Sequence, residues 1–149
     1  EKTAYGNASP EVGERLCQYG TLLKEMGDRR AAVDAFEQAL PILEHGGPAR
    51  RSDVVAVLGA LGSLHVEDSQ PRVATGYLQR ALPMAESQFG RTDPRVGVIL
   101  HDLALAKHQQ YARGEAKDLM TRALAIFEGR LGAADKRTRA CRTTLAAWR

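Results

Sequence analysis

The chain has 149 residues, of which 44% are hydrophobic and 26% are charged, and its formal net charge at pH 7 is +3. This composition is that of one folded domain with a sizeable core, and nothing in it forces intrinsic disorder. No stretch reaches the roughly 20 consecutive apolar residues of a transmembrane helix, so we expect no membrane insertion. The basic residues are scattered and do not form a stripe with exposed aromatic side chains, so nucleic acid is not an expected partner.

Aromatic residues make up only 5% of the chain, and its apolar residues recur at helical spacing. The pattern predicts an all-α fold of seven helices without a strand. Pro10 and Pro94 stand at expected helix starts, where the missing N–H of proline costs nothing, and Asp53 stands near the start of the third helix. In chain order, the expected helices cover about 10–26, 29–45, 52–67, 71–88, 94–110, 113–130 and 136–149.

Shifting the sequence against itself by 42 residues superposes three segments without a gap. The clearest match is Ala39-Leu40-Pro41 with Ala81-Leu82-Pro83 and Ala123-Leu124-Ala125. Each repeat unit consists of two amphipathic helices. We therefore expect a single domain, 1–149, in which 1–9 are the tail of a preceding helix, 10–51, 52–93 and 94–135 are repeats 1, 2 and 3, and 136–149 form a terminal or capping helix.

Small residues recur where helices would cross closely, at positions 20/62/104, 32/74/116 and 39/81/123. With the segment that runs from Asp93-Pro94-Arg95-Val96 to Leu131-Gly132, this pattern resembles the 42-residue tetratricopeptide repeats of kinesin light chains, which are also found in nephrocystin-like scaffold proteins. The resemblance implies a right-handed superhelical solenoid of antiparallel helix pairs. It also implies that the first helix of each repeat lines a concave groove, while the second helices form the convex back.

The same resemblance implies which residues face the groove, and most of them are small, neutral or apolar. The candidate groove residues are Cys17, Thr21 and Lys24 in repeat 1, Ala56, Gly59, Ser63 and Val66 in repeat 2, and Val98, His101, Leu105, His108 and Gln109 in repeat 3. Val66, Val98 and Leu105 are apolar although other leucines already fill the core positions of their helices. We therefore expect these three side chains to contact apolar anchors of a partner peptide.

Catalytic and metal-binding chemistry finds little support in the residue pattern. His101 and His108 are seven residues apart, which is about 10 Å along a helix and too far for a shared metal ion. Cys17 has no positioned base or oxyanion donor near it in the sequence. We therefore predict no catalytic residues, no metal site and no cofactor, and we expect that the chain is not an enzyme.

The predicted function is that of a protein–protein interaction scaffold or adaptor, which holds a peptide or helix of another protein in the concave groove. The alternative is a regulatory or oligomerisation repeat domain of a larger multidomain signalling or enzymatic protein. The sequence leaves that alternative and the oligomeric state open. Cys17 and Cys141 have no CxxC spacing, which fits a reducing compartment or simple packing thiols. An intracellular, cytoplasmic location is expected.

Four further features carry structural predictions. Pro41 and Pro83 lie inside second helices, where each removes a backbone hydrogen bond, so we expect a bend in these two helices. Cys17 and Cys141 should not form a disulfide, because they lie three repeats apart. Arg142 replaces the leucine of the repeats and favours a polar capping helix at the end of the array. Trp148 is expected to pack on the third repeat.

Overall fold

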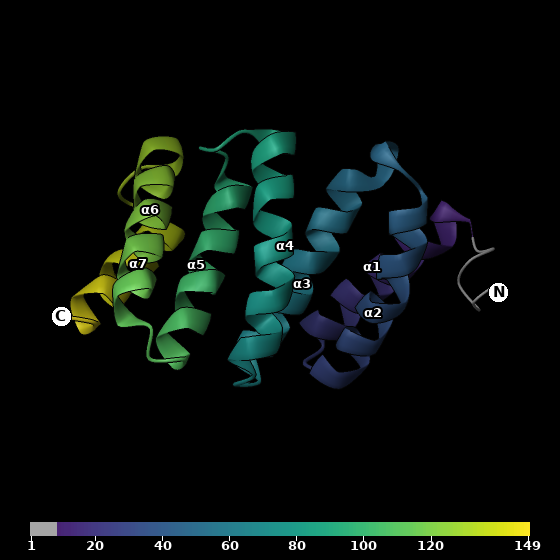
Figure 1. Ribbon diagram of the computed structural model, residues 1–149, viewed down its shortest axis with the longest axis horizontal. Coiled ribbons are helices and arrows are strands. Elements are labelled where there is room, and N and C mark those ends of the chain that lie inside the picture. The colour runs from purple at the N-terminus through teal and green to yellow at the C-terminus, as the bar shows by residue number, and fades with distance from the viewer. Residues whose placement is uncertain (1–8) are drawn as a thin grey trace.

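The computed structural model describes residues 9–149 (Figure 1). The expected tail of a preceding helix falls on residues 1–8 and so lies outside the described residues. The helices are α1 (Pro10–Glu25), α2 (Arg29–His45), α3 (Arg51–Glu67), α4 (Pro71–Phe89), α5 (Pro94–Gln109), α6 (Arg113–Leu131) and α7 (Lys136–Ala147), with a short 3₁₀ segment, η1 (Pro48–Arg50), before α3. Residues 9–149 contain no strand. The predicted all-α fold of seven helices is confirmed.

The helices form an elongated array with α1 and α2 at one end and α7 at the other (Figure 1). Helices α1 and α2, α3 and α4, and α5 and α6 pack as antiparallel pairs, and each pair also contacts the next along the chain. Every extensive contact between helices lies within one repeat or between adjacent repeats. In the view of Figure 1, α2, α4 and α6 face the viewer, with α1, α3 and α7 behind them. This arrangement is a solenoid of helix pairs.

Aspartate side chains begin three of the helices. Asp28, Asp93 and Asp135 accept hydrogen bonds of 3.1, 2.8 and 2.9 Å from backbone N–H groups in the first turns of α2, α5 and α7. Such N-caps satisfy donors that have no partner inside the helix. The prolines expected at helix starts do begin α1 and α5. Short-range signals in the sequence therefore fix where the helices start.

The turn inside each repeat has the same backbone conformation. Gly27, Ser69 and Tyr111 are 42 residues apart, and their φ angles are +86°, +57° and +64°. This left-handed region is open to glycine but costs a residue with a side chain about 1–2 kcal/mol. Two repeats therefore hold a turn that their residues do not favour, which shows that the packing of the helix pair determines it.

The core of each helix pair repeats with the same period. Phe36, Leu78 and Met120 occupy one position of the second helices and are 1%, 0% and 0% exposed. In repeat 2 this side chain lies directly against Gly62 of the first helix, where an added Cβ would come within 2.4 Å of Leu78. Close crossing of the two helices therefore requires a small residue at position 62, as the sequence pattern indicates.

At a second core position, a residue of the first helix faces a residue of the second helix, and which of the two is larger differs between repeats. Gly97 faces Phe127, and an added Cβ on Gly97 would lie 2.7 Å from the phenyl ring. One repeat earlier the corresponding residues are Val55 and Ala85, both buried. The larger side chain is on the second helix in repeat 3 and on the first helix in repeat 2, so the summed volume of the two side chains is roughly conserved. The repeats can thus differ in sequence and still pack alike.

Of the local predictions, two are confirmed. Cys17 and Cys141 are both free thiols. The Trp148 ring stacks on His108 of the third repeat, with ring centres 4.3 Å apart and planes 4° from parallel. Helices α2 and α4 continue through Pro41 and Pro83, and the bend expected at these residues stays a prediction.

Candidate binding groove

A cavity of about 410 Å³ opens between the first helices of the three repeats, and we call it the groove cavity. It is lined by Lys24, Ser52, Val55, Ala56, Gly59, Ala60, Ser63, Phe89, Arg95, Val98, Ile99 and Asp102. Five of these, Lys24, Ala56, Gly59, Ser63 and Val98, are candidate groove residues from the sequence. The structure therefore brings residues of all three repeats to one place.

The floor of the groove cavity is mostly apolar and leaves open space. An added Cβ on Gly59 would meet no atom within 4 Å. Glycine inside a helix costs roughly 1 kcal/mol relative to alanine, so Gly59 lowers helix stability while keeping this space empty. Val98 beside it is 40% exposed, whereas Val55 and Ile99 are buried. An aliphatic or aromatic side chain could therefore enter over Gly59 and contact Val98.

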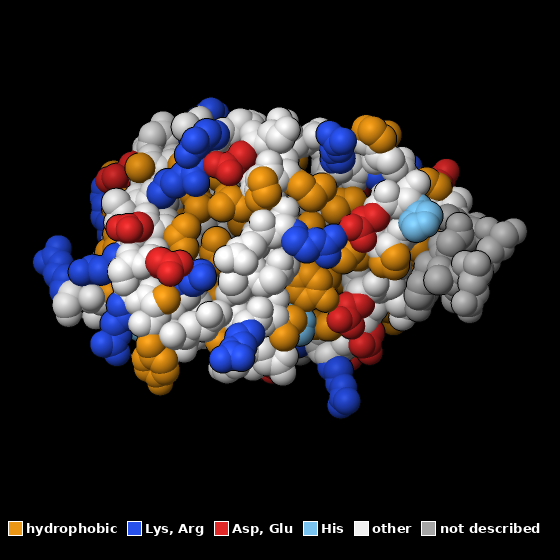
Figure 2. All heavy atoms as spheres, viewed as in Figure 1, with side chains coloured by type: hydrophobic (Ala, Val, Ile, Leu, Met, Phe, Trp, Pro, Cys, Tyr) orange, Lys and Arg blue, Asp and Glu red, His pale blue; other side chains and the backbone are white. Residues whose placement is uncertain are grey.

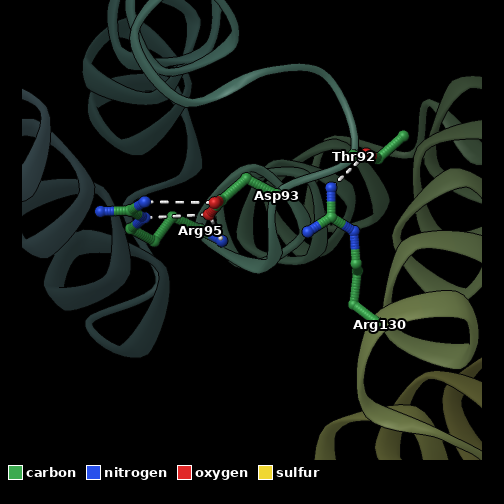
Figure 3. Close-up of polar contacts among 4 residues, drawn as sticks. All are labelled: Thr92, Asp93, Arg95 and Arg130. Carbon is green, nitrogen blue, oxygen red and sulfur yellow. Dashed lines mark hydrogen bonds and ion pairs between the residues drawn. The ribbon is translucent and has the colours of Figure 1, made fainter.

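Arg95 is held at the rim of the groove cavity by two partners. Its guanidinium carbon lies 3.5 Å from the centre of the Phe89 ring. Its Nε and Nη2 atoms donate hydrogen bonds of 2.9 and 3.1 Å to the carboxylate of Asp93, as Figure 3 shows. The hydrogen bond from Arg95 lowers the pKa of Asp93, and the charge of Arg130 lowers it further. Asp93 therefore stays ionised at neutral pH and keeps Arg95 in place over Phe89.

A smaller cavity of about 210 Å³ lies between α5 and α7, and we call it the α5–α7 cavity. Its lining consists of Val98, His101, Phe127, Lys136, Arg137 and Ala140. Val98 lines both cavities, so the two meet at this side chain. His101 points its Nδ1 atom at Asp102, 3.3 Å from the carboxylate oxygen. His101 is thus one more candidate groove residue that lines a cavity.

The candidates of repeat 1 other than Lys24 lie outside both cavities. The hydroxyl of Thr21 donates a 3.0 Å hydrogen bond to the backbone carbonyl of Cys17. Burial, followed by the charges of Asp53 and Glu14, raises the pKa of the half-buried Cys17 thiol. A thiol with a raised pKa is a weak nucleophile at neutral pH. This environment does not support a catalytic role for Cys17.

The remaining candidates serve contacts between helices. Val66 is only 7% exposed, so the expectation of an exposed side chain on the groove wall is wrong for this residue. The reason is that α5 packs against α3, and Gln109 donates a 3.2 Å hydrogen bond to the Val66 carbonyl. Leu105 is half-buried against the core. His108 is covered on one face by Trp148.

Sequence reasoning missed Phe89, Arg95 and Asp102 as lining residues. Phe89 ends a second helix, and the resemblance implies that second helices form the convex back, so this position was not expected in the groove. The available signal was a break in the repeat, because Phe89 stands where repeat 1 has Gly47.

Within residues 9–149, no group of three or more His, Cys, Asp or Glu side chains is arranged to hold a metal ion. None of the helices described for this chain is long and apolar enough to cross a membrane.

Comparison with known proteins gives similarity at the level of structure. No protein-family model matches the chain, and no curated protein matches it significantly in sequence. Among solved structures, the chain is similar to the crystal structure of BtubC (BKLC) from P. vanneervenii, with a TM-score of 0.77 and 18% sequence identity. The match covers 93% of this chain and 55% of BtubC, so the chain spans about half the length of that protein. Because BtubC is a kinesin light chain-like protein, the likeness shows that this chain has an all-α tetratricopeptide-type repeat fold.

Proposed function

We propose that this chain is a protein-interaction scaffold whose concave groove holds a peptide or helix of a partner protein. The observation that carries the proposal is the groove cavity, where five residues expected to face a partner line one open space. An apolar floor with a few polar groups at the rim is the usual character of a binding site. Chemistry on the partner is not part of the proposal, because the groove offers no activated nucleophile.

The expected contact is one aliphatic or aromatic side chain of the partner, inserted over Gly59 and against Val98. A peptide anchored in this way binds with a Kd of about 1 μM, which corresponds to roughly −8 kcal/mol. Lys24 and Ser63 at the edge are available for hydrogen bonds to the partner backbone or to its polar side chains.

The test uses peptides selected from a random display library against the unmodified chain. Val98→Glu should weaken their binding at least 30-fold, because the bound peptide would bury a charge without a partner, at a cost of about 2 kcal/mol or more. Gly59→Leu should have a similar effect by filling the cavity. Dissociation constants are measured by fluorescence polarisation.

Val73→Glu is the matched control, because Val73 is 43% exposed on α4, close to the 40% of Val98. It should leave binding unchanged, and circular dichroism should show equal helicity for all variants. Selected peptides that bind the Val98→Glu and Gly59→Leu variants as tightly as the unmodified chain would contradict the groove as the docking site.

A further inference from the structure

A cavity of about 510 Å³ lies outside the groove, between the α4–α5 connection and α6, and we call it the arginine cavity. Its floor consists of Ala125, Ile126 and Gly129. Its rim carries Thr92 and three arginines, Arg91, Arg122 and Arg130. Figure 2 shows Lys and Arg side chains at the upper left of this face, gathered around one acidic side chain and beside a hydrophobic surface.

The arginine cavity has more positive charge than its carboxylates balance. Arg122 and Arg91 share one carboxylate, that of Glu86, at 2.5 and 3.5 Å. Arg130 donates its 2.9 Å hydrogen bond to the hydroxyl of Thr92, as Figure 3 shows. Asp93, whose pKa is lowered in part by the charge of Arg130, is already paired with Arg95 and does not change the balance. Three guanidinium groups against the Glu86 carboxylate therefore leave a surplus of two positive charges, which repel each other.

The repeat supplies an internal comparison for this cavity. The positions equivalent to its lining, 42 residues earlier, hold Ala49, Arg50, Arg80, Pro83, Met84, Ser87 and Gln88. The two arginines of that set are balanced by carboxylates, because Arg50 pairs with Glu14 and Asp53 and Arg80 pairs with Glu44. The ion pair Arg122–Glu86 has its equivalent there in Arg80–Glu44, at 2.6 Å. That pair therefore belongs to the repeat architecture.

The two other arginines do not belong to that architecture. Arg91 and Arg130 stand where the chain has Ala49 and Gln88 42 residues earlier. Since that part of the chain folds with alanine and glutamine at these places, the fold does not require the extra cations. Arg91 and Arg130 each make one polar contact, with Glu86 and Thr92, but these contacts leave the positive charge in surplus, and a local surplus of positive charge favours an anionic ligand.

We propose that the arginine cavity binds the phosphate monoester of a phosphorylated side chain on a partner protein. A phosphate monoester carries about −1.5 to −2 charges at pH 7, which matches the surplus of two, whereas a carboxylate would neutralise half of it. The planar fork of arginine fits phosphate oxygens with paired hydrogen bonds, and the Thr92 hydroxyl can add another. The apolar floor offers contact to the carbon atoms next to the ester.

One electrostatic effect opposes an anion here. Gly129 and Arg130 lie at the carboxyl end of α6, where the helix dipole is equivalent to about −0.5 charge. Two uncompensated guanidinium charges outweigh this half charge. The Arg130 side chain also lies in the last turn of α6, where a cation compensates the free carbonyls.

The experiment is a titration of ¹⁵N-labelled protein with N-acetyl-O-phosphoserine N-methylamide, followed by NMR at constant ionic strength. We expect saturable shifts of the backbone amides of Thr92 and Gly129 and of the Nε–H groups of Arg91 and Arg130. The corresponding glutamate derivative should bind at least tenfold more weakly. Inorganic phosphate should also bind more weakly, because it lacks the carbon atoms that contact the floor.

The decisive variant is Arg91→Ala with Arg130→Gln, which gives this cavity the residues found at the equivalent positions 42 residues earlier, Ala49 and Gln88. It should lower the affinity for the phosphoserine derivative at least tenfold. Arg72→Gln with Arg139→Ala is the matched control, since it removes the same charge from exposed positions elsewhere. Equal losses in both double variants would reduce the effect to general electrostatics and overturn the proposal.

Three other results of the titration would each contradict the proposal. Equal affinity for the glutamate derivative would make the site a carboxylate site. Equal affinity for inorganic phosphate would remove the protein partner from the proposal. Shifts elsewhere in the chain, or none, would overturn the site itself. The groove cavity does not share a residue with the arginine cavity, so a failure here leaves the proposed function standing, and the reverse also holds.

Discussion

The first and last helices of the array each have one face that meets no neighbouring helix in the described residues, and the two faces differ in chemistry. On α1 the face carries Val12, Tyr19 and Leu22, which are 43%, 56% and 52% exposed. Their equivalents 42 residues later, Val54, Leu61 and Leu64, are 4%, 0% and 1% exposed, in the α3 helix that packs against α2. The outer face of α1 thus has the composition of an internal face of the array.

Helix α7 shows the opposite behaviour. Its inner face packs on α6 through Thr138 and Cys141, both 0% exposed. Its free face carries Arg139 and Arg142, where earlier repeats have glycine or valine and then leucine. Arg142 donates a hydrogen bond to Glu128 of α6 and is otherwise in water. That this helix caps the array stays a prediction.

The two free faces follow different rules. On α7 the residue follows what its face meets, because arginine stands at the register position that holds leucine in the repeats. On α1 it follows the position in the repeat, because the side chains stay apolar although no described helix covers them. An apolar face of this kind should behave differently from its buried equivalents when it is truncated.

The largest expected difference concerns one register position in two helices. Leu61→Ala should destabilise the chain by about 2–5 kcal/mol, because it leaves a cavity in a packed core. Tyr19→Ala, at the equivalent exposed position, should cost less than about 1 kcal/mol. Urea unfolding followed by circular dichroism measures both. A cost for Tyr19→Ala similar to that of Leu61→Ala would mean that the α1 face is covered in solution.

The second prediction contrasts the two thiols. Burial raises the pKa of Cys141 from 9.0 to about 11. The folded chain therefore holds this proton more tightly than the unfolded chain does. The stability that Cys141 contributes is complete below pH 9 and is lost as the pH rises through about 11. Between pH 8 and pH 11 the melting temperature should fall more steeply for the unmodified chain than for Cys141→Ala.

Thiol labelling gives an independent check of the same contrast. At pH 8, a disulfide reagent should modify the half-buried Cys17 first and reach Cys141 only when α7 detaches from α6. Labelling of both residues at one rate would show that α7 is not docked as described.

Much of this fold could be predicted from the sequence because every repeat gives the same information again. The 42-residue period, the small residues at crossings and the prolines at helix starts fix the seven helices and their pairing. Five candidate residues line one cavity because their register fixes the side of the first helix on which they lie. The period cannot give the distance between successive first helices, which decides that Val66 is buried and that Gln109 reaches its backbone carbonyl.

Features outside the repeat were harder to predict. The contact of Arg95 with Phe89 and Asp93 depends on the path of the α4–α5 connection, which only the folded chain defines. The arginine cavity joins that connection to α6, 30 or more residues further along. In both cases the visible signal was a residue that departs from its equivalents, such as Phe89 for Gly47 or Arg130 for Gln88. Departures from the period therefore mark residues of both proposed binding sites.

The smallest expected effect concerns Arg142 on the free face of α7. Arg142→Leu restores the leucine of the repeats and removes the ion pair with Glu128, whose side chains are 45% and 42% exposed. A pair this exposed contributes about 0–1 kcal/mol, so the melting temperature should change by only a few degrees. The new apolar side chain extends the partly buried Leu145 and Trp148, and sedimentation should show self-association that increases with concentration.

Arg142→Gln is the control, because it removes the charge without adding apolar surface and should remain as dispersed as the unmodified chain. A loss above about 2 kcal/mol in both variants would mean that Arg142 fastens α7 to α6. In that case the polar face of α7 would hold this helix on α6 through the ion pair and would not be an adaptation to solvent.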